Sequence, residues 1–218
     1  MRKDVVIVGI KTNEEADKAV LEMDAAVREI TAALDSGKVR PSASGLVSDA
    51  CGMVRDTSGL VRDCSGLARD ASGLVSDTET AGLYKDLAKK TRDLCREAAR
   101  FSRYCRRIAV LARTEDPSRM VRDASGLVSD AVRMVRNASG LVSDALGLVR
   151  GMNSKERIEQ IKETAENLME KADELEKHAE YVTDPEEVSV LAKDASGIVR
   201  DVSGIVRDAS GLVRNCTG

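Results

Sequence analysis

The largest concentration of side chains that could bind a ligand is a basic segment between Lys85 and Arg113. It contains ten basic residues and only three acidic ones. Within it, Lys89, Arg96 and Arg103 recur every seven residues, which places them on one outward side of a helix. Ammonium and guanidinium groups attract phosphates without reading a base sequence. These three residues therefore form a candidate anion-binding face, and we expect weak, non-specific polyanion binding there.

An acidic segment offers the opposite interpretation. Residues 155–180 carry nine acidic residues against five basic ones, and they could neutralise the basic face within the fold. Phe101 lies on the apolar side of the basic segment, so we do not expect it to stack on bases. The sequence leaves both interpretations open.

Residues for catalysis or metal binding are sparse. His178 is the single histidine, and its position among glutamates beside an apolar residue is typical of a helix surface. A di-iron bundle needs two Glu-x-x-His motifs, and the sequence has none. The run around Gly9 and Lys11 lacks the glycine spacing of a phosphate-binding loop. We therefore expect no enzyme activity, no catalytic or metal site and no cofactor.

Cysteine usage and hydropathy bear on location. No apolar run reaches the roughly 18 to 20 residues of a membrane-spanning helix, and the long apolar stretch of a signal peptide is missing from the first residues. An odd number of cysteines without a CxxC motif predicts free thiols in a reducing compartment. We expect a cytoplasmic protein without a transmembrane segment, with free thiols at Cys51, Cys64, Cys95, Cys105 and Cys216.

A seven-residue repeat determines the expected architecture. We assign heptad position a to the residue before serine. Positions a, d and e then form one apolar face, and serine at position b lies at the edge of that face. Glycine at position c points outward, and positions f and g are polar. The same spacing continues through segments without the repeat, which favours a helix over a β-solenoid. The unit Ser-Gly-Leu-Val-(Arg/Ser)-Asp begins at Ser44, Ser58, Ser72, Ser125 and Ser139, with close variants from Ser65, Ser196, Ser203 and Ser210.

Prolines and glycines divide this pattern into helices. Proline is favoured at the first helical position and glycine just after the last, so Pro41, Pro117 and Pro185 predict starts, and Gly37 and Gly151 predict stops. The predicted fold is all-α, an elongated antiparallel bundle of about six long helices in three hairpins. The helices are expected near 13–36, 42–77, 80–114, 117–150, 154–182 and 185–215. The hairpins occupy 1–78, 79–151 and 152–218, and we expect one cooperative domain.

The first residues depart from the helical pattern. The β-branched run 5–10 predicts a short N-terminal strand. A lone strand is unstable, so an α/β alternative pairs it with 108–112 and 188–192 in a small parallel sheet. The Asp-Pro-Glu-Glu sequence before Val188 favours a helix in the last of these segments.

Outward glycines make the repeat helices dependent on packing, because each costs about 1 kcal/mol relative to alanine in a helix. Small residues at positions a and c would allow close approach of another helix, a second subunit or a lipid surface. We therefore expect self-association through Ala/Gly-lined helices.

The near-verbatim heptads and aligned proline starts resemble an engineered or computer-generated heptad-repeat helical bundle, over about half of the chain, and no natural family is recognised in the sequence. Tandem expansion in a natural gene is the alternative origin. The resemblance implies a structural or scaffold protein. The second hypothesis is a binding module, which would use the basic face of helix 85–113 for polyanions or the Gly/Ser-backed amphipathic helices for lipid surfaces.

Overall fold

The computed structural model describes residues 2–113, 117–149 and 155–217, and this part of the chain contains six α-helices and no strand. The all-α prediction is confirmed. The helices are α1 (Arg2–Asp35), α2 (Pro41–Ser72), α3 (Thr78–Leu111), α4 (Pro117–Leu148), α5 (Lys155–Ala179) and α6 (Pro185–Thr217). The largest differences from the predicted limits are the early start of α1 and the end of α2 at Ser72 rather than near 77. Gly151, a predicted stop, lies outside the described residues.

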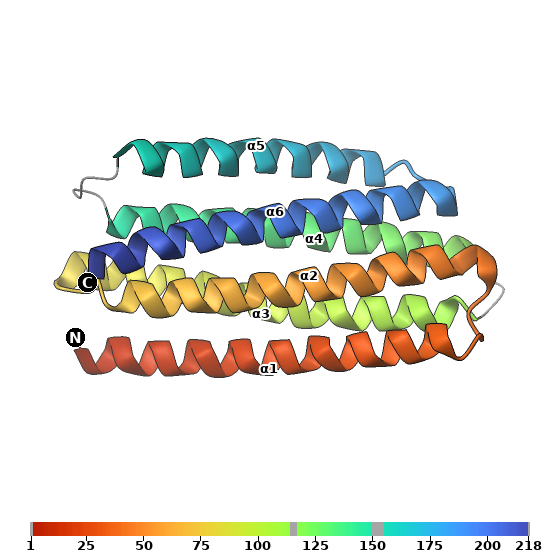
Figure 1. Cartoon of the computed structure of the whole chain (residues 1–218), viewed down its shortest axis with the longest axis horizontal. Helices are drawn as coiled ribbons and strands as arrows, with labels where there is room; N and C mark the ends of the chain where they lie inside the picture. Colours follow the sequence, from red (N-terminus) through yellow and green to blue (C-terminus); the bar gives the residue numbers. More distant parts are fainter. Residues whose placement is uncertain (1, 114–116, 150–154, 218) are drawn as a thin grey trace.

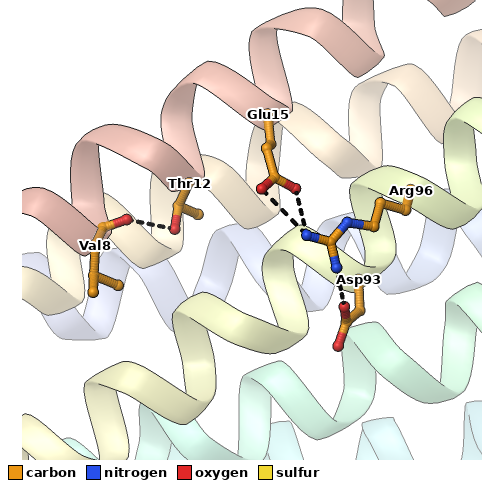
Figure 2. A network of polar contacts seen from close by, with 5 residues as sticks. All are labelled: Val8, Thr12, Glu15, Asp93 and Arg96. Atoms are coloured by element: carbon orange, nitrogen blue, oxygen red, sulfur yellow. Dashed lines mark hydrogen bonds and ion pairs between the residues drawn. The ribbon is translucent and has the colours of Figure 1, made fainter.

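The predicted N-terminal strand is wrong, because residues 5–10 belong to α1. The two segments proposed as its sheet partners lie in helices as well, 188–192 within α6 and 108–112 at the end of α3 and its cap. Thr12 shows why the helix prevails. Its buried hydroxyl donates a hydrogen bond to the Val8 carbonyl at 2.8 Å (Figure 2). Val5 lies on the same face of the helix as Thr12 and is 7% exposed. Burial of this helical face overrides the strand preference of β-branched residues.

Local chemistry accounts for the helix ends. Asp77 caps α3, because its carboxylate accepts a hydrogen bond from the Thr80 amide while the Thr80 hydroxyl accepts one from the Asp77 amide. The hydrogen bond from the Thr80 amide, and then the one that the Thr80 hydroxyl donates to the same carboxylate, lower the pKa of Asp77. Gly37 follows α1 with φ of 64°, the left-handed conformation that glycine adopts readily. The three predicted proline starts are confirmed at Pro41, Pro117 and Pro185.

Four helices form the centre of the elongated bundle (Figure 1). In cyclic order α2, α6, α4 and α3 pack against one another, with only a slight diagonal contact between α2 and α4. On one side α1 packs on α2 and α3, and on the other α5 packs on α4 and α6. The chain reverses direction at each connection, so α2 and α6 run the same way (Figure 1). Because α2 packs most extensively against α6, contact extends beyond sequence-adjacent helices.

One buried apolar cluster extends through all six helices. Its bulk is Leu, Val, Ala, Ile and Met, and Phe101 is fully buried, as predicted. Several position-b serines are also buried, Ser58 at 3% and Ser203 at 4% exposure, which differs from the edge position expected for them, whereas Ser125 is half-buried and Ser44 is exposed. The outward placement of position-c glycines is confirmed, since a Cβ atom added at Gly59 or Gly204 would meet nothing within 4 Å.

Candidate functional site

The three residues of the predicted basic face differ in whether they have acidic partners in the structure. Arg96 lies between two acids, with Nη2 3.3 Å from the Glu15 carboxylate of α1 and Nη1 2.9 Å from Asp93 of its own helix (Figure 2). Arg103 Nη1 lies 3.8 Å from Glu22 of α1. Lys89 is exposed, and within the described residues no ion pair involves it. Two of the three predicted residues therefore already have acidic partners.

The partners of this face come from α1, where Glu15, Glu22 and Glu29 recur every seven residues. Glu29 lies 3.0 Å from Arg106 Nε and continues the series. The segment 155–180, which the sequence offered as the neutralising partner, does not have that role, because α5 makes no contact with α3 in the part of the chain that the structure describes. The seven-residue spacing that Glu15 and Glu22 share with Arg96 and Arg103 was the available sequence signal.

A groove between α1 and α3 brings part of the basic face together. Its volume is about 410 Å³, and its lining includes four basic residues and two acidic ones. Lys89 is not among the lining residues, so the structure brings together only two members of the predicted triad. The groove retains an excess of positive charge that could hold an anion. Its charged residues are Lys18, Arg96, Arg100, Arg103, Glu15 and Glu22.

A second polar array lies between α2 and α6, and the sequence reading missed it. Serine hydroxyls of α6 donate to aspartate carboxylates of α2 at four successive heptads, always 140 residues apart. We call this array the Ser/Asp ladder. Arginines of α6 approach three of the same carboxylates, for example Arg207 Nε at 3.0 Å from Asp63. Both helices carry the same seven-residue repeat, with serine at position b of α6 and aspartate at position g of α2, so a constant separation between such pairs was a usable signal. The pairs are Ser189–Asp49, Ser196–Asp56, Ser203–Asp63 and Ser210–Asp70.

The Ser/Asp ladder fits a structural role. Activation of a serine hydroxyl as a nucleophile requires a general base such as histidine, and the one histidine, His178, is exposed on α5, as predicted. In the ladder the hydroxyl donates to a carboxylate that also lies next to an arginine. The arrangement satisfies buried polar groups and fixes the register of two helices.

The thiols are mostly inaccessible. Four cysteines on α2 and α3 are buried, and Cys216 is half-buried. Burial raises the pKa of Cys95 to about 12 and raises the pKa values of Cys64 and Cys105 well above their usual range. A protonated thiol is a poor nucleophile and a poor metal ligand. Among the described residues no group of three His, Cys, Asp or Glu side chains could hold a metal ion.

Comparisons of this chain with protein-family models, curated proteins and solved structures found no match. Across the described helices, none has the length and apolar content required to cross a membrane. The contacts and charges of this chain alone therefore carry the functional proposal.

Proposed function

We propose that the protein is a structural scaffold without a catalytic site, which holds its two outer helices in fixed positions. The observation that carries this proposal is the single buried core shared by all six helices. The antiparallel hairpins 1–78, 79–151 and 152–218 act in it as one cooperative domain. The near-verbatim heptads support an engineered or computer-generated origin.

The arrangement of α1 and α5 supports a role as a platform. They pack on opposite sides of the four central helices, and each leaves a broad face uncovered (Figure 1). Leu21 on α1 is 66% exposed and Met169 on α5 is 37% exposed, so both faces can carry attached groups. Arginine–glutamate pairs connect α1 to α3, and Arg136 of α4 connects to α5 through Asp173 at 2.6 Å.

Spin labels on the two outer helices test the scaffold. In a Cys216→Ser background, labels at Leu21→Cys and Met169→Cys should give one narrow distance distribution, because the buried native thiols resist labelling. Each single-label variant is the control, since any distance it shows arises between molecules and reports self-association. A broad distribution, or separate unfolding of an outer helix in a denaturant melt, would contradict the proposal.

A second candidate is weak polyanion binding on the α1–α3 side, which the net positive groove and the exposed Lys89 favour. Its affinity for a generic oligonucleotide should fall steeply with salt as counterions are released. The lipid-surface alternative has less support, because repeat positions a, d and e are occupied by neighbouring helices, as at Ala50, Met53 and Val54, all 0% exposed.

Charge variants test whether the basic residues on the α1–α3 side bind a polyanion or are neutralised by acids within the fold. Lys89→Gln should weaken oligonucleotide binding, whereas Glu22→Gln should strengthen it by releasing Arg103. Lys171→Gln on α5 changes the net charge equally and is the matched control, since Lys171 is exposed on the far side. The polyanion hypothesis fails if low-salt anisotropy titrations detect no binding, or if Lys171→Gln weakens binding as much as Lys89→Gln.

A further inference from the structure

An uncharged groove lies at the end of the bundle where α1 begins. Its volume is about 760 Å³, nearly twice that of the basic groove between α1 and α3. Its walls come from the first turns of α1, from the connection between α2 and α3, and from Tyr84 of α3. No lining residue is charged, and Val5, Val6, Ile10 and Val75 supply an apolar surface. Small-molecule sites typically have volumes of about 300 to 1,000 Å³ and linings of this kind.

Tyr84 supplies an unsatisfied polar group at the wall of this groove. The residue is 0% exposed, and its hydroxyl has no hydrogen-bond partner among the described residues. Burial raises the pKa of Tyr84, so the hydroxyl is neutral at pH 7 and can donate one hydrogen bond. A buried hydroxyl without a partner is destabilising, and a ligand that accepts or donates one bond would remove that penalty.

The backbone at Gly9 comes close to this hydroxyl. A Cβ atom at position 9 would lie 3.0 Å from Tyr84 Oη, closer than ordinary van der Waals contact. On the solvent side of the same helix turns, Val6 and Ile10 are 58% and 52% exposed, unusually high values for large apolar residues in this protein. The groove therefore combines an unpaired buried hydroxyl, a glycine whose missing side chain allows α1 to approach it, and an exposed apolar rim.

We propose that this groove binds a small, uncharged, aromatic alcohol whose hydroxyl pairs with Tyr84 Oη and whose ring contacts the valine and isoleucine side chains. A charged ligand is disfavoured, because the lining offers no opposite charge to offset the cost of removing it from water. Aromatic rings suit the apolar walls, and a single hydroxyl can donate to or accept from the tyrosine.

Equilibrium dialysis with 1-naphthol and naphthalene tests the proposal. The full chain should bind 1-naphthol at one saturable site, about fivefold more tightly than naphthalene, since one neutral hydrogen bond contributes a difference of this size. Tyr84→Phe should bind both compounds equally, because the ring remains and only the hydroxyl is lost. Absence of saturable binding, or an unchanged preference for 1-naphthol in Tyr84→Phe, would overturn the proposal.

Variants that fill the groove provide the spatial control. Gly9→Leu should abolish binding of both compounds, and Gly82→Leu should not, because Gly82 lies in open space on α3 outside the groove lining. Ile10→Trp blocks the groove from its solvent side and replaces Gly9→Leu if circular dichroism shows that variant unfolded. Equal loss in Gly82→Leu would overturn the site. A dimer in light scattering that dissociates in Gly9→Leu would assign the groove to a second copy and also overturn the proposal.

Discussion

The same repeat lies in two different helix interfaces. Between α2 and α6 the repeat faces a second copy of itself, the helices are parallel, and polar partners keep a constant separation of 140 residues. Between α4 and α3 the repeat faces an ordinary basic helix that runs in the opposite direction (Figure 1). The repeat is thus compatible with either orientation of its neighbour.

The difference lies in the partners of identical positions. At position g, Asp63 of α2 accepts from Ser203 and Arg207 of α6, whereas Asp144 of α4 pairs with Lys90 of α3 at 2.7 Å. At position b, Ser203 is hydrogen-bonded, whereas the Ser139 hydroxyl is buried without a hydrogen-bond partner among the described residues. The apolar positions of the repeat define a helix face, and the neighbouring helix determines what the polar positions contribute.

The largest effect is expected where the two interfaces are alike. Leu60 of α2 and Leu141 of α4 occupy position d and are both 0% exposed. Leu60→Ala and Leu141→Ala should each reduce the free energy of unfolding by about 2 to 5 kcal/mol. Urea melts followed by circular dichroism measure both. A small loss in only one variant would show that the apolar positions also differ between the interfaces.

The serines should separate the interfaces. Ser203→Ala removes a hydrogen bond of the Ser/Asp ladder and should cost about 1 kcal/mol. Ser139→Ala removes a buried hydroxyl that lacks a partner, so it should be neutral or stabilising. Denaturant melts of the two variants give the comparison directly. Equal losses would mean that the ladder contributes no more than an unpaired serine.

Glycine substitutions should act in the opposite direction and less strongly. Gly204→Ala in α6 points into open space and should stabilise the protein by up to about 1 kcal/mol. Gly140→Ala in α4 should give a similar or smaller gain, because its methyl group would lie 3.6 Å from Lys90 Nζ, an ordinary contact with a flexible side chain. Strong destabilisation by either variant in thermal melts would reveal a packed glycine face, such as a self-association surface.

The smallest effect concerns pH and the α3–α4 interface. Burial raises the pKa values of Asp130 and Glu97, against the opposing influence of Arg133 on the first and Asn137 on the second. A carboxyl group whose pKa is higher in the folded protein than in the unfolded chain stabilises the fold when it is protonated. This contribution is complete below the unfolded pKa, about 4, and is lost as pH rises through the folded pKa. The stability of Asp130→Asn relative to the unchanged protein should therefore improve from pH 4 to pH 7. Urea melts at both pH values check the sign, and a relative stability that is constant or falls would refute it.

Properties that depend on local periodicity were predictable from the sequence. The apolar face of the repeat, the outward glycines and the proline starts each follow from the geometry of one helix. Local signals failed at residues 5–10, where strand preference gave way to burial of Val5 and Thr12 on a helix face.

Properties that depend on which helices meet were decided by tertiary structure. The basic residues of α3 have partners on α1 and α4 rather than in 155–180, although 155–180 carries nine acids and α4 only three. The groove at Tyr84 likewise exists only because the start of α1 meets the connection between α2 and α3. A heptad specifies which side of a helix is buried, but many neighbours can cover an Ala/Leu/Val face equally well. The choice among them, and with it every interhelical partner, is made by the packing of the whole core.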